Sequence, residues 1–553
     1  MRKLPILGIL GGILLTAAVL AVPLGLDNDA GWGMSRVLLA AIGFLLITTN
    51  WIAIKHRQEI AKIEAALVGL EDSRKVGLSL AIVFILISGV YFWYGTPAFE
   101  NPEFRFDYYG KMATAFKHGQ VHLLEEPPPS LLALSDPYDY ALRYETGVVN
   151  EIPIDITLYK GKYYLYWGPA PSLFLIPFTE EVISQIKDKF IGYFFACGVL
   201  LYLTLFIFQI WKHTKPSLPN RFTFFFTLVT GLSIPALWMI KTSGIYEAAI
   251  FSGQFFFIGG YYWLYCALSD DTISKRKLLL GGIHWAFAMG TRLTVWPAIL
   301  LGAIATLLYL LKDYKLTPPR KIITSPLLFA LPPFAALLLL GWYNYSRFDS
   351  VADFGLKYQL ANTDYRSFTS PFASYYIKSN LHNYFTYPVA IQEKFPFIKP
   401  TENTSSNERL AGLIYTSPWI LFFIIPLLQF ILSFIKKKDK ATLSSPEIWF
   451  LFSAGGGSAV MLSLILMFYF PATRYIEDFT PSFFLLSFFL TAKDFSINHE
   501  SAWKKFFLGI FTLLGIWSIV CSLLISLPVE HVVKIVKLSL QFRNILLGFG
   551  IGG

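Results

Sequence analysis

The chain has 553 residues, of which 55% are apolar and only 15% are charged, and its formal net charge is +10. This composition excludes intrinsic disorder, which needs low hydrophobicity and high charge, and an ordinary soluble protein, in which about 25% of residues are charged. The basic residues form short clusters between apolar runs instead of a stripe with interleaved aromatics, so we expect no nucleic-acid partner. The composition predicts an all-α fold, a polytopic bundle of membrane helices.

Long apolar runs follow one another along the chain, and a spanning helix needs about 20 such residues. Residues 278–311 are too long for one span and short for two, and Gly290-Thr291-Arg292 is a break signal, so we expect two short or half-buried helices there. The total is about thirteen spans. The other expected spans lie near residues 4–26, 36–54, 77–96, 189–211, 222–240, 246–268, 322–344, 409–435, 447–470, 476–492 and 503–527.

Three parts are expected along the chain. Residues 1–75 form an extra N-terminal hairpin of two spans with a cytoplasmic loop, and the first span is too long for the apolar region of a signal peptide. Residues 76–500 form the membrane core. Residues 501–553 form the last span and an outer tail, which mixes Val, Ile and Leu with Lys534, Lys537 and Arg543 and is therefore expected at the membrane interface.

Clusters of Lys and Arg predict which loops face the cytoplasm. If the N-terminus is cytoplasmic and 278–311 counts as two helices, every basic cluster falls on the cytoplasmic side. The clusters lie within 55–75, 212–221, 275–277, 312–321, 436–440 and 493–505. Two long segments, about 97–188 and 345–408, then face outward. Because long connections in a compact protein are usually functional, we expect the active site on the outer face.

Asp107 is the first candidate catalytic residue. It lies in Phe106-Asp107-Tyr108-Tyr109, about ten residues beyond the third span, at the start of a weak helical pattern over 108–118. A carboxylate near the outer interface suits a general base that acts on a hydroxyl, and Tyr108 beside it suits substrate binding. The alternative is a solvated loop aspartate.

The segment Asp155 to Pro171 is rich in aromatic residues and lysines. Tyr163, Tyr164 and Tyr166 are candidates for binding a sugar, and Lys162 is a candidate for binding a phosphate. An aromatic belt at the membrane interface explains the same residues without a ligand. Residues 167–185 are apolar but interrupted by prolines, which favours a membrane-surface or re-entrant helix over a span.

A few charged residues lie at the outer ends of spans, where a charge near the bilayer usually faces a cavity. Arg292 and Arg474 are candidates for binding the donor phosphate, and Glu247, Arg347 and Tyr475 for binding substrate. Snorkelling to the interface is the alternative for each charge taken alone.

No metal site is predicted. The cysteines Cys197, Cys266 and Cys521 lie inside apolar runs without metal-ligand spacing, and His284 is more typical of a buried histidine with a partner on a neighbouring helix. No nucleotide-binding or hydrolase motif occurs in its required context.

These motifs resemble the C-type glycosyltransferases, multi-spanning enzymes that use polyprenyl-phosphate sugars and include protein O-mannosyltransferases and lipid A aminoarabinose transferases. Asp107 matches the acidic residue of their first outer loop, with Tyr108 where Glu is commoner; Gly161 to Pro171 resembles their Pro-rich return to the membrane. Two further motifs are similar to motifs of this family. They are the break at Gly290, which has Arg292 in place of Lys, and Arg474-Tyr475 followed by Pro481. The resemblance covers about 77–492 and is strongest to a bacterial subgroup without an assigned substrate.

The resemblance implies an inverting sugar transfer on the outer face of the bacterial cytoplasmic membrane, from a polyprenyl-phosphate donor to a hydroxyl of a lipid, glycan or protein. Asp107 would be the base, and Arg292 and Arg474 would stabilise the leaving phosphate. Some relatives use a divalent cation at the acidic loop; the lone Asp107 favours a reaction without cofactors, with a cation as the open alternative.

Two other functions fit many spans. A transporter or lipid flippase would place ionisable residues near mid-membrane. An O-antigen-ligase-like transferase would place the chemistry in segment 345–408, with Arg347, Arg366 and His382.

Overall fold

The structure is a computed structural model. It describes residues 5–21, 73–100, 107–153, 155–214, 220–312, 319–367, 370–404, 408–424, 427–428, 443–497 and 502–548, and the single residues 36, 40, 43, 44, 47 and 406. Most of the second expected span, 36–54, and the second half of the expected run 409–435 lie outside the described residues.

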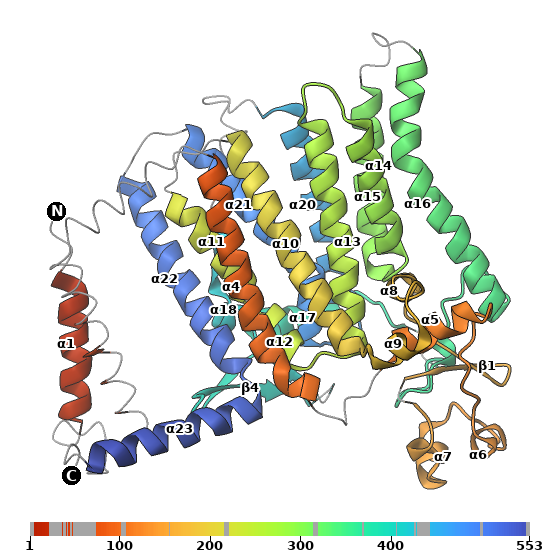
Figure 1. Ribbon diagram of the computed structural model, residues 1–553, viewed down its shortest axis with the longest axis horizontal. Helices are drawn as coiled ribbons and strands as arrows, with labels where there is room; N and C mark the ends of the chain where they lie inside the picture. The colour runs from red at the N-terminus through yellow and green to blue at the C-terminus, as the bar shows by residue number, and fades with distance from the viewer. Residues whose placement is uncertain are drawn as a thin grey trace.

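Long helices that run side by side make up most of the molecule (Figure 1). Apolar runs without polar interruption form these helices because a helix satisfies all of its own backbone hydrogen bonds, as a lipid environment requires. They are α1 (Pro5–Val19), α4 (Ser73–Glu100), α10 (Asp188–Thr214), α11 (Asn220–Leu232), α13 (Ile245–Leu268), α14 (Lys275–Met289), α15 (Trp296–Leu311), α16 (Pro319–Phe348), α20 (Ser445–Met467), α21 (Thr480–Ile497) and α22 (Ala502–Ile525). The last helix, α23 (Val529–Gly548), is steeply inclined to them (Figure 1).

Six helical stretches among the described residues are long and apolar enough to cross a membrane: Ser73–Pro97, Asp188–Thr214, Leu293–Leu311, Ile323–Phe348, Ser445–Met467 and Phe506–Ile525. The expected class, an all-α membrane protein, agrees with these helices, while the total of about thirteen spans stays a prediction. The break expected at Gly290-Thr291-Arg292 is confirmed, since α14 ends at Met289 and α15 begins at Trp296 after the short 3₁₀ helix η2 (Leu293–Val295).

The centre of the bundle is α10, which packs against α4, α13 and α21, while α14 packs between α13 and α16. His284 lies on α14 and is hydrogen-bonded to a neighbouring helix, as expected: its Nε2 is 2.6 Å from the hydroxyl of Tyr202 on α10. That hydroxyl also accepts a hydrogen bond of 3.1 Å from the indole N–H of Trp263 on α13. The polar groups of three helices thus satisfy one another inside the bundle.

Two expected spans are interrupted in the structure. The run 222–240 divides into α11 and the short helix α12 (Ala236–Lys241), with Pro235 between them, because proline lacks the N–H that a continuous helix needs. The described part of the run 409–435 is strand β5 (Arg409–Leu410), helix α18 (Leu413–Thr416) and the 3₁₀ helix η6 (Pro418–Phe423). Both interruptions place a charged residue, Lys241 of α12 and Arg409 of β5, at the end of the bundle where the cavity described below lies.

Both long connecting segments lie at one end of the bundle, the lower end in Figure 1. The helix expected over 108–118 is confirmed as α5 (Tyr108–Lys117), and the proline-interrupted stretch 167–185 forms two short helices, α8 and α9. The other elements of the first segment are short: α6 (Pro129–Leu132), α7 (Tyr140–Glu145), η1 (Val148–Asn150), β1 (Thr157–Tyr159), β2 (Lys162–Tyr164), α8 (Ala170–Leu173) and α9 (Glu180–Gln185).

The second connecting segment is equally irregular. Its elements are η4 (Leu356–Tyr358), α17 (Tyr376–Leu381), η5 (His382–Thr386), β3 (Val389–Ile391) and β4 (Ile398–Glu402), and η7 (Thr473–Asp478) precedes α21. Strands β1 and β2 form an antiparallel hairpin with Thr157 opposite Tyr164, and β3, β4 and β5 form a second antiparallel sheet. An isolated bridge between Thr157 and Gln359 joins the two segments into one unit.

The first segment is also fixed to the membrane helices by a close backbone contact. The N–H of Gly168 donates to the carbonyl of Thr291 at 3.2 Å, and the N–H of Ala170 donates to the carbonyl of Gly290 at 2.9 Å. A Cβ at position 168 would overlap the carbonyl oxygen of Gly290, so only glycine fits there. The two motifs that the sequence analysis singled out separately, 161–171 and 290–292, therefore meet.

Candidate functional site

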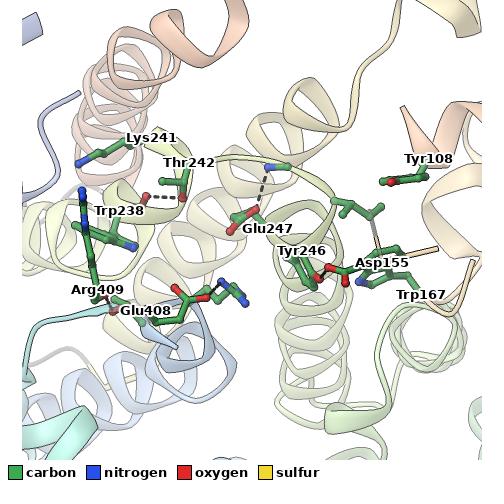
Figure 2. A pocket seen from close by; sticks show the side chains of 14 residues that line it. Tyr108, Asp155, Trp167, Trp238, Lys241, Thr242, Tyr246, Glu247, Glu408 and Arg409 are labelled. Atoms are coloured by element: carbon green, nitrogen blue, oxygen red, sulfur yellow. Dashed lines mark hydrogen bonds and ion pairs between the residues drawn. The ribbon is translucent and has the colours of Figure 1, made fainter. Parts of the chain in front are cut away.

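A large cavity, of about 400 Å³, opens at the end of the bundle where the connecting segments lie (Figure 2). Figure 2 shows Tyr108, Asp155 and Trp167 at one end of the cavity and Trp238, Lys241 and Arg409 at the other. The full lining comes from α5, the segment before α8, α12, the start of α13, β5 and η7: Tyr108, Asp155, Trp167, Trp238, Lys241, Thr242, Gly244, Ile245, Tyr246, Glu247, Glu408, Arg409, Thr473 and Arg474.

Asp155 is the carboxylate at the aromatic end of the cavity. Its φ of 57° lies in the left-handed region, which non-glycine residues seldom occupy and which is enriched at functional sites. The hydroxyl of Tyr246, at the start of α13, donates a hydrogen bond to its Oδ2. Burial raises the pKa of Asp155 above its ordinary value, while the Tyr246 hydrogen bond and the charge of Arg474 oppose that rise. A carboxylate in these surroundings has a pKa closer to neutrality and is a stronger base.

Arg474 lies in the middle of the cavity and is held by an acid and two rings. Its Nη1 donates to Oε1 of Glu408 at 2.9 Å. Its guanidinium carbon lies 4.8 Å from the ring centroid of Tyr246 and 5.3 Å from that of Tyr475. Because planar guanidinium groups stack on aromatic faces, these contacts fix the direction in which Arg474 presents its remaining donors.

Arg292 also lies near Tyr475, with its guanidinium carbon 5.9 Å from that ring centroid. Its Nη2 donates to Oδ2 of Asp478 at 2.8 Å, and the Asp478 side chain is completely buried. The two arginines predicted from the sequence thus both lie near one tyrosine ring. Arg292, however, is neutralised by a buried carboxylate and is not among the residues that line the cavity.

Lys241 and Arg409 form the basic end of the cavity. The Nζ of Lys241 lies 4.7 Å from the ring centroid of Trp238. The pKa of Lys241 is lowered to about 8, mainly by burial and also by the charge of Arg409, while the charge of Glu530 opposes the fall. Within the part of the chain that the structure describes, neither cation forms an ion pair. Two neighbouring cations without a carboxylate partner favour binding of an anion between them.

Asp107 lies at a different cavity, of about 220 Å³, on the other side of α5. It is the residue before the first turn of α5. Its carboxylate forms ion pairs with Lys187 at 3.2 Å and with Lys111 at 3.7 Å. The next residue, Tyr108, lines the large cavity, because successive residues at a helix start point about 100° apart. Of Asp107, Arg292 and Arg474, only Arg474 therefore lines the large cavity.

The position of α5 depends on Asp188, the first residue of α10. Its two carboxylate oxygens accept the backbone N–H groups of Tyr108 at 2.9 Å and of Tyr109 at 3.1 Å. The side chain of Asp107 makes no such capping bond. A residue 80 positions away therefore satisfies the free N–H groups of this helix, which the sequence analysis did not foresee.

The remaining candidates from segment 155–171 divide into two groups. Tyr163 and Tyr164 are buried on the β1–β2 hairpin, where Tyr164 packs on Phe348 with ring centroids 5.4 Å apart, and Lys162 beside them is exposed. None of the three lines the large cavity. Tyr166 does not line it either, but its ring packs at a tilt against Trp167, with ring centroids 4.3 Å apart. Burial raises the pKa of Tyr166. The charges of Tyr475 and Asp155 raise this pKa further, while those of Arg292 and Arg474 lower it. Tyr166 is therefore within electrostatic reach of both arginines.

Glu247 and Arg347 have fixed partners. Glu247 lines the large cavity, and its Oε2 accepts the backbone N–H of Gly244 at 2.9 Å at the start of α13. Arg347 is buried away from the cavity: it donates to the carbonyl of Leu165 and stacks on Tyr343, with 3.9 Å from its guanidinium carbon to that ring centroid. Arg347 thus holds the segment that leads to Trp167 and does not face the cavity.

The residues proposed for a ligase-like site in the second segment also lie away from the cavity. Arg366 pairs with Asp136 at 2.6 Å and with Asp364 at 2.8 Å, which ties the two connecting segments together at the surface. His382 is exposed and shares a hydrogen bond of 2.9 Å with Thr386 one turn later. The second segment reaches the cavity through Glu408 and Arg409 instead.

Comparison of the chain with protein-family models, with curated proteins and with solved structures finds no match. The resemblance to C-type glycosyltransferases therefore stays a prediction, and the cavity itself has to support any function. No group of three or more His, Cys, Asp or Glu side chains within the described ranges is arranged to hold a metal ion.

Sequence patterns pointed to no role for Asp155, Lys241, Glu408 or Arg409. One signal was available. Charged residues are scarce in this chain, and Lys241 is the charged residue of the short outer connection 241–245, while Glu408 ends the second long segment and Arg409 begins the next apolar run. Selecting every outer charge next to a span, instead of those in recognisable motifs, would have found all three.

Proposed function

We propose that the chain is a glycosyltransferase of the bacterial cytoplasmic membrane, with about thirteen spans, its N-terminus inside and its active site facing outward. It would move a sugar from a polyprenyl-phosphate donor to a hydroxyl of a lipid, glycan or protein acceptor. One observation carries the proposal: the cavity at the loop end of the bundle has a half-buried carboxylate, Asp155, at one end, and at the other end Lys241 and Arg409, two cations that form no ion pair among the described residues.

Asp155 is the general base of the proposed reaction. The acceptor oxygen forms a bond to the anomeric carbon while the bond from that carbon to the phosphate oxygen breaks, and the bonding pair leaves with the phosphate. The acceptor proton passes to Asp155, whose Oδ2 is held by Tyr246. Attack from the face opposite the leaving group inverts the anomeric configuration. Because Asp107 is paired with two lysines at another cavity, it is the weaker candidate for this role.

The leaving phosphate is assigned to Lys241 and Arg409, with Arg474 beside them. A transition state in which charge develops on phosphate is stabilised by cations that are already in place. Arg292 would act indirectly, since it is held by Asp478 and lies near Tyr475, the ring that Arg474 also contacts.

The sugar is assigned to the aromatic end of the cavity. Tyr108, Trp167 and Tyr246 present ring faces and hydroxyl groups beside Asp155, which suits stacking on an apolar sugar face and hydrogen bonding to its hydroxyls. The rings of Tyr108 and Trp167 lie 5.8 Å apart, and those of Trp167 and Tyr246 lie 5.2 Å apart.

The alternatives receive less support. A transporter or flippase needs a binding site near mid-membrane, whereas the two cavities described above lie at the end of the bundle where the connecting segments are. A ligase-like reaction centred on Arg366 and His382 is weakened because Arg366 is engaged by two carboxylates and neither residue lines the cavity.

The test is a transfer assay with membranes that contain the full chain and a panel of radiolabelled undecaprenyl-phosphate hexoses and aminosugars. We expect the wild type to consume one labelled donor, and Asp155→Asn to lose at least a hundredfold in rate at equal expression, since general-base catalysis contributes about 10²–10⁴-fold. Asp271→Asn, an exposed carboxylate between α13 and α14, is the matched control and should keep full activity.

Two outcomes would count against the proposal. If Asp107→Asn abolishes transfer while Asp155→Asn does not, the base is Asp107 and the large cavity is not the active site. If the wild type neither consumes a donor nor binds undecaprenyl phosphate, the chain is not an enzyme of this class.

A further inference from the structure

The last helix, α23, has its polar residues on one stripe. Glu530, Lys534, Lys537 and Gln541 follow one another at intervals of four, three and four residues, which places them on one face of a helix. Apolar residues occupy most of the remaining circumference. This narrow polar stripe differs from the uniformly apolar spans and is typical of a helix that lies in a membrane interface.

One apolar side of α23 is anchored on the bundle. The ring of His531 stacks on Trp93 of α4 with centroids 4.1 Å apart, and its Nε2 donates to the carbonyl of Trp93 at 2.7 Å. Val532 and Ile535 pack against the same core. The start of α23 is therefore fixed to the end of a membrane helix.

A second apolar side of α23 faces away from the protein. Val529 is 70% exposed, Val533 46% and Leu540 48%, and these residues fall next to the polar stripe. In Figure 1, α23 lies across the lower end of the bundle, steeply inclined to α22 and α4. A helix in this position, at the end of membrane helices, meets the bilayer interface, so the bilayer is the surface that its exposed apolar side chains contact.

We propose that α23 lies in the headgroup layer and binds the surface of an anionic bilayer. Val529, Val533 and Leu540 enter the boundary of the hydrocarbon, while Lys534 and Lys537 reach the phosphates of anionic headgroups such as phosphatidylglycerol. Both lysines are exposed and, among the described residues, form no ion pair, so their charge is available to lipid. This inference goes beyond sugar transfer and does not depend on it.

The place of α23 gives the lipid contact a further meaning. Glu530, in the first turn of α23, is one of the charges that act on Lys241, so α23 begins beside the basic end of the large cavity. Anionic lipids held along α23 would therefore collect next to that end of the cavity.

The depth of α23 can be measured on the full chain in nanodiscs of phosphatidylcholine with phosphatidylglycerol. The native cysteines Cys197, Cys266 and Cys521 are replaced by alanine, and a nitroxide is attached to Val533→Cys or, as a matched aliphatic control, to Ile391→Cys on β3. We expect the label at 533 to be accessible to oxygen and protected from a water-soluble nickel chelate, and the label at 391 to show the reverse. Equal access of the chelate to both labels would overturn the proposal.

The lipid class is tested by titrating the solubilised full chain with phosphatidylglycerol or phosphatidylcholine under native mass spectrometry. We expect tighter binding of phosphatidylglycerol, and a loss of about fivefold for each lysine in Lys534→Gln/Lys537→Gln. The control Lys378→Gln/Lys394→Gln removes two exposed lysines of the second segment and should bind like the wild type. Equal affinity for both lipids, or no change in the α23 variant, would contradict the proposal whatever the transfer assay shows.

Discussion

The hydroxyl of Tyr246 donates a hydrogen bond to Asp155 and so joins the first turn of α13 to the loop before β1. Without this bond, the carboxylate of Asp155 would lie in an aromatic environment where the charges of Arg474 and Arg143 lower its pKa. The bond fixes one oxygen of Asp155 and moderates the rise in its pKa that burial causes. The proposed base is therefore tuned by a residue that lies far from it in the sequence.

The transfer rate should depend on pH through Asp155. A base acts in its charged form, and burial raises the pKa of Asp155, so activity is present above this raised pKa and is lost as the pH falls through it. Tyr246→Phe removes a hydrogen bond that lowers the pKa, and we therefore expect the acid limb of kcat/KM to move to higher pH. An acid limb at the same pH in Tyr246→Phe would show that another group titrates.

Binding of the leaving group should depend on Lys241 and Arg409. A hydrogen bond to a charged group contributes about 1.5–3 kcal/mol, so Lys241→Gln and Arg409→Gln should each weaken binding of undecaprenyl phosphate by about ten- to a hundredfold. Lys162→Gln is the comparison: the sequence predicted a phosphate contact there, whereas the structure places this lysine on an exposed hairpin. Titration of the solubilised chain measures all three, and the largest loss in Lys162→Gln would restore the sequence-based assignment.

The ion pair between Arg292 and Asp478 should matter for stability. Asp478 is completely buried, so Arg292→Gln leaves a buried carboxylate without its cation, which costs about 3–5 kcal/mol in comparable cases. Asp478→Asn should also destabilise, and the double variant should lose less than the sum of the two single variants. Thermal unfolding in detergent gives the three values; strictly additive losses would mean that the two residues do not interact.

Gly168→Ala should separate the first segment from the α14–α15 break. The added methyl overlaps the carbonyl of Gly290, so the two backbone hydrogen bonds of Gly168 and Ala170 cannot both persist. We expect a lower unfolding temperature together with reduced kcat/KM, because the neighbouring Trp167 lines the cavity. Gly89→Ala on α4 has open space around it and should be neutral or slightly stabilising; equal effects of the two variants would contradict the role of Gly168.

The sequence predicted what depends on local pattern. The apolar runs of α4, α10 and α22 are long and uninterrupted, and the break at Gly290 is signalled by a residue that favours turns. The interruption at Pro235 was missed because the run around it is apolar enough to suggest one span. Proline removes one hydrogen bond of the helix ladder, but it does not by itself predict a break, since α16 continues through Pro326, Pro332 and Pro333.

The composition of the cavity could not be predicted in the same way, because its residues meet only in three dimensions. Asp155 contacts Tyr246, Lys241 lies near Arg409, and Glu408 pairs with Arg474; no local period relates the members of these pairs. Asp107 is the opposite case, because its motif was recognisable in the sequence but its side chain does not line the large cavity. The next residue, Tyr108, lines that cavity instead.

Asp188 has a consequence for how the membrane itself acts on the site. This residue begins α10 and, through the backbone of Tyr108 and Tyr109, also begins α5. A bilayer that is thicker or thinner than the hydrophobic length of α10 changes the tilt of that helix. The change would be transmitted through the carboxylate of Asp188 to Tyr108, which lines the cavity. We therefore expect acyl-chain length to alter turnover in reconstituted vesicles and Asp188→Asn to weaken that dependence.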